Sequence, residues 1–244
     1  MPWIGGARLV VERGMTGATG NLYCGLHEFA DMALLLHYFG GGPGLFLDVG
    51  ANIGSYTILA AKARGAKVIA VEPAPLSGER LLLNLAVNQI QNLVEFHRVA
   101  VGAVPGKVWF SMDCDTTNQV VDESYPGTKT KVEVQTLDTI VAGRSAGFWK
   151  VDVEGFETAV LQGAESSLAD PGVEVVLLEG NDPAIIAIMM RHGFQLRQYD
   201  PWNRKLNIPG AATAGGNHIW VRRPDTIEDR CRQAPPLDVF GVLL

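Results

Sequence analysis

The sequence predicts an α/β fold built on a doubly wound, mostly parallel sheet. An apolar run at Leu45–Leu47 is closed by Asp48 and by glycines at Gly50 and Gly54, and a helical stretch follows over Tyr56–Lys62. Strand, glycine turn and helix in this order are typical of a ligand-binding loop at the carboxyl end of a parallel strand. Further apolar runs of strand length alternate with helical stretches as far as residue 222, which favours a parallel sheet with crossover helices.

The glycine turn lets backbone N–H groups approach a ligand where a Cβ would obstruct it. A dinucleotide site would need Gly-x-Gly-x-x-Gly, but Asn52 and Ser55 occupy the positions of the second and third glycines. The Gly-x-x-x-x-Gly-Lys motif of nucleoside triphosphate sites is absent as well. The pattern Asp-x-Gly-x-x-x-Gly instead resembles the first motif of class I S-adenosylmethionine-dependent methyltransferases, with a plain tight turn as the alternative.

Composition excludes several classes of protein. The 244 residues include 47% hydrophobic and 19% charged side chains, which is ordinary for a globular chain with an ample core. A net charge of -6 argues against a nucleic-acid backbone as the main partner, because phosphate binding favours a basic face. Three widely spaced cysteines (Cys24, Cys114 and Cys231) predict reduced thiols in a cytoplasmic protein. Without a signal core or an apolar stretch of about 18 residues, we expect no membrane span.

The residues before the first core strand predict an N-terminal strand and a helix cap over residues 1–40. Arg8–Glu12 is the strand candidate, and apolar residues recur at helical spacing over Glu28–Phe39. His27, Glu28 and His37 lie on or beside this helix. A position over the mouth of a cofactor site would explain these side chains, but we expect them on the solvated surface.

A second buried strand, Ala66–Glu72, ends in an acid and is stopped by Pro73. An acidic side chain at this strand end can accept both ribose hydroxyls of a bound nucleoside. A helix over Glu79–Asn88 and a third strand over Leu93–Val101 follow. The end of that third strand, Val99–Val101, should lie beside the adenine of such a ligand.

The pattern changes after the third strand. Lys107–Met112 and Lys131–Thr136 predict two strands of an antiparallel excursion. The polar stretch between them, Asp113–Thr130, is long enough to form a lid or a substrate loop. Thr136 or Asp138 is available as the N-cap of the next helix.

The second stretch with chemical side chains is a buried strand at Phe148–Val153, where Lys150 and Asp152 alternate with apolar residues and Glu154 follows. Alternation puts these three charged side chains on one face. They are costly there without a ligand or mutual pairing, so we interpret them as an active site, with a structural ion pair as the alternative. Together with Glu179 the acids offer oxygen ligands of the magnesium type, but such carboxylates are common without metal and we expect none.

The remaining elements complete the sheet. We expect two strands, a helix between them and a closing strand, in chain order Glu174–Glu179, Pro183–His192, Phe194–Tyr199 and Asn217–Arg222. The Gly- and Pro-rich stretch Pro201–Gly216 is expected to be a loop that shapes the acceptor pocket. No linker demands a second domain, so we predict one domain over residues 1–244, with a core over 45–222 and a tail over 223–244. The apolar end of the tail, Val239–Leu244, predicts docking on a second subunit and a homodimer.

Several of these stretches together resemble the FkbM family of methyltransferases. They are the glycine loop, the acid after the second strand, the helix cap, the charged strand with its turn, and the closing strand: Leu47–Gly54, Val71–Pro73, Thr136–Asp138, Lys150–Glu157 and Asn217–Arg222. The Lys-x-Asp-x-Glu-Gly-x-Glu stretch is the most specific of them. The resemblance spans roughly residues 28–222.

The resemblance implies a Rossmann-like class I methyltransferase fold, whose seven-stranded sheet has an antiparallel last strand, with S-adenosylmethionine as cofactor. It also implies O-methylation of a hydroxyl on a small molecule, because members act typically on sugars or secondary metabolites. Carried over by position, the cofactor-binding residues are Asp48, Gly50, Ala51, Asn52, Gly54, Glu72, Pro73, Val99, Ala100 and Asp152. The glycine loop would line the methionine end, Glu72 would take the ribose hydroxyls, and Asp152 would lie near the sulfonium and the acceptor.

Asp152, Lys150 and Glu154 are the predicted catalytic residues. Methyl transfer needs a nucleophile in line with the methyl group in a site that excludes water, and an alcohol acceptor also needs a general base. We expect Asp152 or Glu154 to be that base, with Lys150 setting its protonation. His218 and His27 are weaker candidates.

Other functional classes stay open at this point. Methylation of a carboxylate or nitrogen acceptor, or a non-catalytic S-adenosylmethionine-binding protein, would keep the same cofactor loop. An oxidoreductase on a nicotinamide cofactor is weakened by Asn52 and Ser55. A methyltransferase acting on nucleic-acid bases would be expected to carry Asn/Asp-Pro-Pro-aromatic where this chain has Val153–Phe156. We therefore expect a small-molecule acceptor, no nucleic acid and no membrane.

Overall fold

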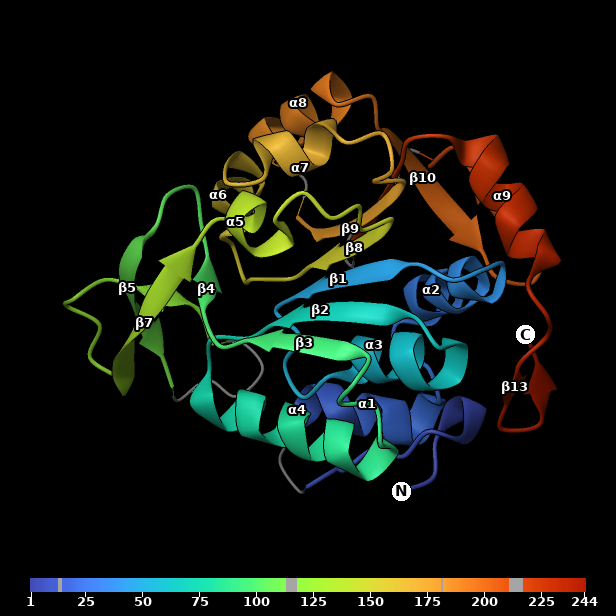
Figure 1. The fold of residues 1–244 in the computed structure, drawn as a ribbon, viewed down its shortest axis with the longest axis horizontal. Coiled ribbons are helices and arrows are strands. Elements are labelled where there is room, and N and C mark those ends of the chain that lie inside the picture. Colours follow the sequence, from blue (N-terminus) through green and yellow to red (C-terminus); the bar gives the residue numbers. More distant parts are fainter. Residues whose placement is uncertain (13–14, 113–117, 181, 211–216) are drawn as a thin grey trace.

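The central feature of the fold is an eight-stranded sheet in the order β11-β10-β12-β9-β8-β1-β2-β3. The computed structural model describes residues 1–12, 15–112, 118–180, 182–210 and 217–244 (Figure 1). The strands of the sheet are β1 (Leu45–Val49), β2 (Lys67–Val71), β3 (Val94–His97), β8 (Phe148–Val151), β9 (Val175–Glu179), β10 (Gln195–Asp200), β11 (Lys205–Asn207) and β12 (Asn217–Val221).

The direction of the strands confirms the predicted doubly wound fold. β3, β2, β1, β8 and β9 pair in parallel, whereas β12 runs antiparallel between β9 and β10. The antiparallel last strand of the class I methyltransferase fold is therefore present. β11 adds an eighth strand on the outer edge of β10, within the stretch expected to be an irregular loop. That expectation was wrong for Lys205–Asn207, and residues 211–216 of the same stretch lie outside the described residues.

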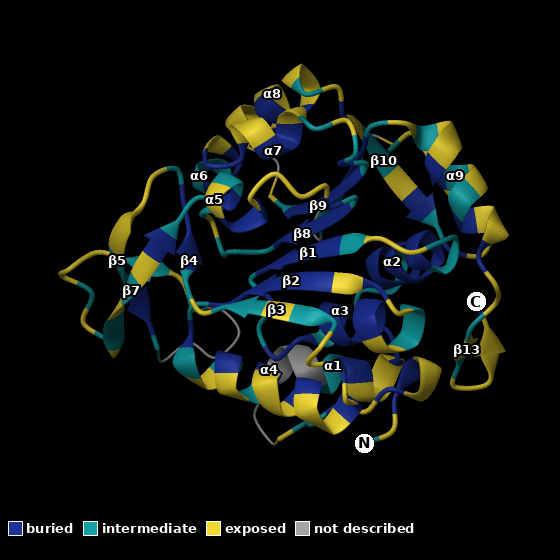
Figure 2. Ribbon diagram, viewed as in Figure 1, coloured by how far each residue is buried: buried dark blue, intermediate teal, exposed yellow. Residues whose placement is uncertain are grey.

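Successive side chains of the parallel strands point into two separate hydrophobic cores. On β1, Phe46 belongs to one core and Leu47 to the other, and on β8 Phe148 and Trp149 divide in the same way. Strands buried on both faces are nearly continuous apolar runs, which is why the sequence marks them clearly. Figure 2 shows these strands as the buried centre of the fold.

Helices cover both faces of the sheet, with α3 and α4 on one side and α5 to α8 on the other (Figure 1). The helices are α2 (Phe29–Gly40), α3 (Ser55–Ile58), continued by the π-helical turn η2 (Leu59–Ala63), α4 (Pro75–Asn88), α5 (Leu137–Val141), α6 (Glu157–Gln162), α7 (Glu165–Ala169), α8 (Pro183–Arg191) and α9 (Pro224–Gln233). Residues of α2 and α9 complete the core that contains Phe46.

The third predicted strand is in fact two strands in two sheets. β3 ends at His97, and β4 (Ala100–Val101) pairs in parallel with β7 in a smaller sheet of order β4-β7-β5-β6. The members of this sheet after β4 are β5 (Gly106–Ser111), β6 (Val120–Val121) and β7 (Lys129–Gln135). The pairing of β5 with β7 confirms the antiparallel excursion. Residues 113–117 of the proposed lid lie outside the described residues, and the Thr136 side chain caps α5 by accepting from the Thr139 N–H.

Two buried asparagines on α4 hold the N-terminal segment against the fold. The Asn84 side chain accepts from the Val10 N–H at 2.8 Å and donates to the Ile53 carbonyl at 2.9 Å. Asn88 accepts from the Arg8 N–H and donates to the Arg8 carbonyl, both at 2.7 Å. These side chains satisfy the backbone that a strand partner would otherwise satisfy, so the strand predicted over residues 8–12 does not form. This segment contains α1 (Thr16–Cys24), a short 3-10 turn, η1 (Ile4–Gly6), and an isolated antiparallel bridge between Pro2 and Arg8, and its other described residues are irregular.

His37 on α2 is buried, so the expectation of a solvated position was wrong. Its side chain is fully covered, and Nδ1 is 2.6 Å from the hydroxyl of Tyr199. Burial, followed by the charges of Arg204 and Arg64, lowers the pKa of His37 to about 3. The imidazole is therefore a neutral core group.

The tail forms a helix and a hairpin that fold back on the same chain. After α9, the strands β13 (Asp238–Val239) and β14 (Val242–Leu243) pair, and Leu237 and Leu244 exchange backbone hydrogen bonds of 3.0 Å. The Leu244 side chain is buried, whereas Leu243 is exposed. The homodimer stays a prediction. None of the helices in the described ranges is long and apolar enough to cross a membrane, and Cys24 and Cys231 are free.

We predict that Asn84→Ala lowers the free energy of unfolding by about 2–4 kcal/mol, because it leaves the Val10 N–H and the Ile53 carbonyl without their partner. Chemical denaturation monitored by circular dichroism measures this. The control is Asn92→Ala, at an exposed position, which should change the free energy by no more than about 0.5 kcal/mol. Equal effects of the two substitutions would contradict the clamping role of Asn84.

Candidate active site

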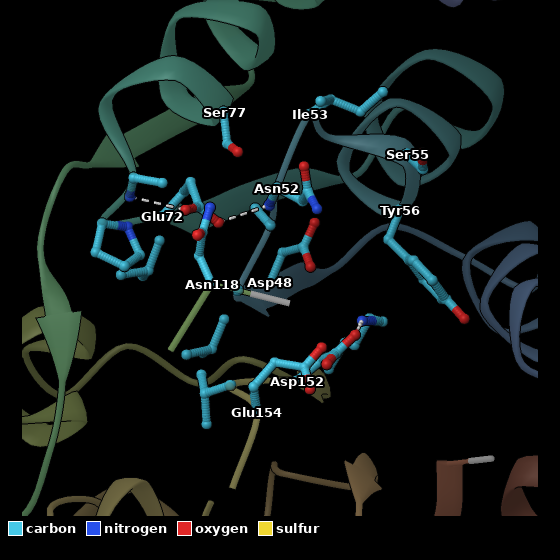
Figure 3. Close-up of a pocket in the computed structure, with 18 of the residues that line it drawn as sticks. Asp48, Asn52, Ile53, Ser55, Tyr56, Glu72, Ser77, Asn118, Asp152 and Glu154 are labelled. Atoms are coloured by element: carbon cyan, nitrogen blue, oxygen red, sulfur yellow. Dashed lines mark hydrogen bonds and ion pairs between the residues drawn. The ribbon is translucent and has the colours of Figure 1, made fainter. Parts of the chain in front are cut away.

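A cavity of about 380 Å³ lies at the carboxyl ends of β1, β2 and β8 (Figure 3). Most of the predicted site residues line it, namely Asp48, Gly50, Ala51, Asn52, Glu72, Pro73, Val99, Ala100, Lys150, Asp152 and Glu154. The exception is Gly54, which does not line the cavity. Gly54 has a φ of 90° at the N-terminus of α3, and a Cβ there would contact Leu81. Its role is the turn itself.

Close packing between the glycine loop and the end of β8 explains why position 50 is a glycine. Its φ is 78°, and a Cβ at this position would lie 1.8 Å from the Asp152 carbonyl oxygen. The Gly50 and Ala51 N–H groups both donate to the Val71 carbonyl, at 2.9 and 3.0 Å. The loop is therefore fixed between two neighbouring strands, and only glycine fits where it passes the backbone of Asp152.

Glu72 ties the end of β2 to the glycine loop. One carboxylate oxygen accepts from the Asn52 N–H at 2.9 Å and the other from the Ala74 N–H at 2.8 Å (Figure 3). Burial raises the pKa of Glu72 to about 7, against the lowering effect of these two hydrogen bonds. Each oxygen keeps a second lone pair, so the carboxylate can still accept hydroxyl donors from the cavity.

Lys150 is the buried cation of the site. Its ammonium lies 2.5 Å from Asp152 Oδ2 and 4.9 Å from the centre of the Tyr56 ring, and its Cα pairs with that of Asp48 across β1 and β8. Burial would lower the pKa of Lys150, but the charges of Asp152, Glu28 and Asp48 raise it. Burial raises the pKa of Asp48 to about 6, partly offset by Lys150 and by a hydrogen bond from Thr57. Asp48, Lys150 and Asp152 thus form one charge network at the ends of β1 and β8, and Asp48 and Lys150 are buried.

Three carboxylates gather on the open side of this network. Oxygens of Asp152, Glu154 and Glu179 lie within 4.8 Å of one another. Burial would raise the pKa of Asp152, but the charge and hydrogen bond of Lys150 lower it. Burial and then the neighbouring Asp152 raise the pKa of Glu179 to about 7, and burial with the charge of Asp152 also raises that of Glu154. The absence of a bound metal stays a prediction. The physical reason for it is that the Lys150 ammonium already supplies positive charge beside Asp152.

Glu157, the last acid of the Lys-x-Asp-x-Glu-Gly-x-Glu stretch, has a backbone role. Its buried carboxylate accepts from the Val153 N–H at 3.2 Å and from the Gly155 N–H at 3.1 Å. These bonds hold the turn in which Glu154 has a φ of 53°. Glu157 thus presents the Glu154 side chain to the cavity without lining it.

The N-terminal segment supplies a wall of the cavity that the sequence interpretation missed. Its lining residues are Met15, Asn21, His27, Glu28 and Met32. The expectation of a solvated surface was wrong for Glu28, which is partly buried beside the cavity, while His27 is exposed at its rim. Tyr56 on α3 was missed as well. The sequence interpretation did contain one signal for this wall. It was the alternative in which the helix over residues 28–39 lies over the mouth of the cofactor site.

A family model for the methyltransferase FkbM domain matches residues 48–205. The chain belongs to the FkbM methyltransferase family. The glycine loop, the charged strand β8 and the excursion all lie inside the matched span. The wall supplied by residues 15–32 and the closing strand β12 lie outside it.

A solved structure of the same family is similar in fold to this chain. A methyltransferase FkbM from Methylobacillus flagellatus KT has 17% identity and a TM-score of 0.50, with 73% of this chain and 43% of that one covered. The present chain thus spans less than half the length of that protein. A ribosomal protein L11 methylase from Lactobacillus delbrueckii subsp. bulgaricus has 14% identity and a TM-score of 0.47, with coverages of 81% and 80%. A search of curated proteins gave no match.

S-adenosylmethionine is the methyl donor of this family. The residues present fit this cofactor. Acidic side chains outnumber Lys150 in the cavity lining, which suits a cationic sulfonium, and Gly50 keeps the loop free of a side chain beside β8. The residues with open acceptor positions are Asp48, Glu72 and Asp152, and their individual roles toward the cofactor stay predictions.

We predict that Gly50→Ala weakens binding of S-adenosylmethionine by about 100-fold, because the loop must move away from the Asp152 carbonyl. Titration calorimetry measures the affinity. The matched control is Gly65→Ala, where φ is 72° and a Cβ meets open space. That variant carries the same backbone strain, costs about 1 kcal/mol of stability and should bind normally. Normal binding by Gly50→Ala would refute the close-packing argument.

Proposed function

We propose that this methyltransferase transfers a methyl group to a hydroxyl of a small molecule, such as a sugar or a secondary metabolite. The observation that supports this is the group of three carboxylates, Asp152, Glu154 and Glu179, beside the buried ammonium of Lys150. An acceptor hydroxyl must be held and must give up its proton, and this group offers acceptors for both purposes.

Bound S-adenosylmethionine supplies a methyl group that is already activated by its sulfonium. The protein therefore acts by positioning the acceptor, excluding water and receiving a proton. Asp152 is kept ionised by Lys150 and is suited to accept the hydrogen bond of the acceptor hydroxyl. Glu179, with a pKa of about 7, is suited to take up the proton released as the oxygen attacks. Glu154 is the alternative proton acceptor.

Electrostatics favours a neutral or cationic acceptor. A carboxylate acceptor or a phosphate backbone would enter a cavity in which Lys150 is the one Lys or Arg among several acids of the described lining. A nitrogen acceptor remains the second possibility, and product analysis separates the two. Retained cofactor binding without turnover on any hydroxylated compound would instead favour a non-catalytic binding protein.

The direct test is to incubate the protein with S-adenosylmethionine and panels of sugars and hydroxylated natural products. Release of S-adenosylhomocysteine detects turnover, and nuclear magnetic resonance of the product identifies the methylated atom. A methoxy product supports the proposal. Methylation confined to nitrogen or carboxylate acceptors would overturn it.

We predict that Asp152→Asn lowers kcat by about 100-fold or more while the Kd of S-adenosylmethionine changes by less than about threefold. Asparagine keeps a carbonyl oxygen for Lys150 but cannot hold or accept the acceptor proton as a carboxylate does. Steady-state kinetics and calorimetry measure the two quantities, with thermal melting to verify folding. An unchanged kcat would exclude Asp152 from the chemistry.

The pKa of Glu179 predicts a pH dependence of turnover. Below about pH 7 this carboxyl is protonated and cannot accept a proton, so kcat should rise through about pH 7 and level off above it. Glu179→Gln should remove this step and lower the plateau by about tenfold or more. A pH–rate profile of both proteins provides the measurement. The same step in the variant would assign it to another group.

A further inference from the structure

A second cavity of about 300 Å³ adjoins the candidate active site. It lies between the start of α2, the start of β12 and the strand β10. Its lining includes Glu28, Asp31, Asn217 and His218, with Arg197 and Tyr199 from β10. Its lining residues from α2 and β12 lie outside the span that the family model matches.

Two contacts connect this cavity with the carboxylates of the active site. Glu28 lines both cavities. Asn217 is the direct strand partner of Glu179 across β12 and β9, and directly opposed residues of neighbouring strands point to the same face. The second cavity is therefore within reach of a ligand whose reacting group lies beside Glu179.

Two carboxylates in the second cavity accept hydrogen bonds from the same neutral amide. The Asn217 side-chain amide donates to Glu28 Oε1 at 3.0 Å and to Asp31 Oδ2 at 2.9 Å. Asp31 is buried, and neither acid forms an ion pair within the part of the chain that the structure describes. Burial raises the pKa of Asp31 to about 6, with the Asn217 hydrogen bond lowering it and the charge of Glu28 raising it further. Two acids thus repel each other across one amide.

The cations nearby are engaged elsewhere. The Arg197 guanidinium donates to the Leu196 carbonyl and to Gln195, and the Lys150 ammonium is paired with Asp152. Burial lowers the pKa of His218, which keeps its ring neutral at neutral pH, and its buried Nδ1 has no partner among the described residues. Tyr56, whose hydroxyl faces the charges of Glu28 and Asp31, is uncharged because burial raises its pKa well above the usual value. The charge of Lys150 acts on both carboxylates, but no Lys or Arg of the described ranges forms an ion pair with Glu28 or Asp31.

We propose that the second cavity binds a protonated amino group of the acceptor, so that the substrate is an amino alcohol or an amino sugar whose hydroxyl is methylated. This inference rests on the proposed O-methylation. An ammonium group has three donors and a positive charge, and it satisfies Glu28 and Asp31 together. Because it is protonated, its nitrogen has no lone pair to attack the methyl donor. The amine therefore positions the substrate, and the hydroxyl reacts.

The test uses matched acceptors that differ in the amine. Glucosamine is compared with N-acetylglucosamine and glucose, and serinol with glycerol, as substrates and as ligands of the S-adenosylhomocysteine complex. We expect the aminated compounds to have a Kd or KM lower by about tenfold or more. Asp31→Asn, in the second cavity alone, should remove most of this preference while the Kd of S-adenosylmethionine stays unchanged. Glu28→Gln should also remove it, measured as the ratio of the affinities for aminated and unaminated probes, because Glu28 lines both cavities. The control Glu165→Gln alters an exposed acid on α7 and should leave the preference intact.

The possible outcomes separate the two proposals. Methylation of hydroxyls without preference for the amine would overturn the amine site and leave O-methylation in place. Binding of the aminated probes that Asp31→Asn weakens, without turnover, would support the amine site and leave O-methylation without support. Transfer of the methyl group to the amine nitrogen would overturn both. Failure of every aminated probe to bind at millimolar concentration would overturn the amine site.

Discussion

The site depends on one buried cation, the ammonium of Lys150. It lies inside the sheet, where an unpaired charge would cost several kcal/mol, so carboxylates must surround it. Asp48 and Asp152 do so from neighbouring strand ends, and the aromatic face of Tyr56 covers it from α3. The otherwise apolar strands tolerate these charged side chains because the side chains meet at the same end of β1 and β8 and compensate one another. Replacing Lys150 alone would leave its acidic partners without compensation.

Acids in this fold divide into those that hold the backbone and those that face the cavity. Glu157 uses its carboxylate for two N–H groups of the turn after β8, while Glu72 does the same for the glycine loop and still lines the cavity. Asp152 and Glu179 make no such backbone contacts through their side chains in the described chain. This division explains how a cavity rich in acids keeps a fixed shape. The backbone-holding acids fix the loops, and the remaining carboxylates are available for a ligand.

Local patterns made much of the fold and part of the site predictable. The glycine loop and the stretch from Lys150 to Glu157 depend on residues that are close in sequence, and both were recognised. The split between β3 and β4 was not, because no glycine or proline interrupts Leu93–Val101 and the change of sheet depends on pairing with distant β7. The helix α9 was missed because Ile227 and Cys231 are its two buried apolar residues, too few to give a period.

The wall that the N-terminal segment supplies to the site was less predictable than the glycine loop and the charged strand β8. Glu28 has an ordinary helical context in sequence, and its significance comes from contacts with Asn217, far away along the chain. Asn84 and Asn88 likewise gave no local sign of the backbone that they bind. Such contacts connect segments of high sequence separation, which short-range patterns do not record. The family resemblance includes the strand that begins at Asn217, but it does not indicate which side chains Asn217 contacts.

The hydrogen bonds between Asn217 and the two acids on and beside α2 have a consequence for biosynthesis. The ribosome makes Asn217 189 residues after Glu28. Until the second of them emerges, the first strands and the glycine loop can assemble, but the second cavity lacks one side. Contacts of such separation form late in folding. A nascent chain would therefore acquire its cofactor loop before it acquires the means to select an acceptor.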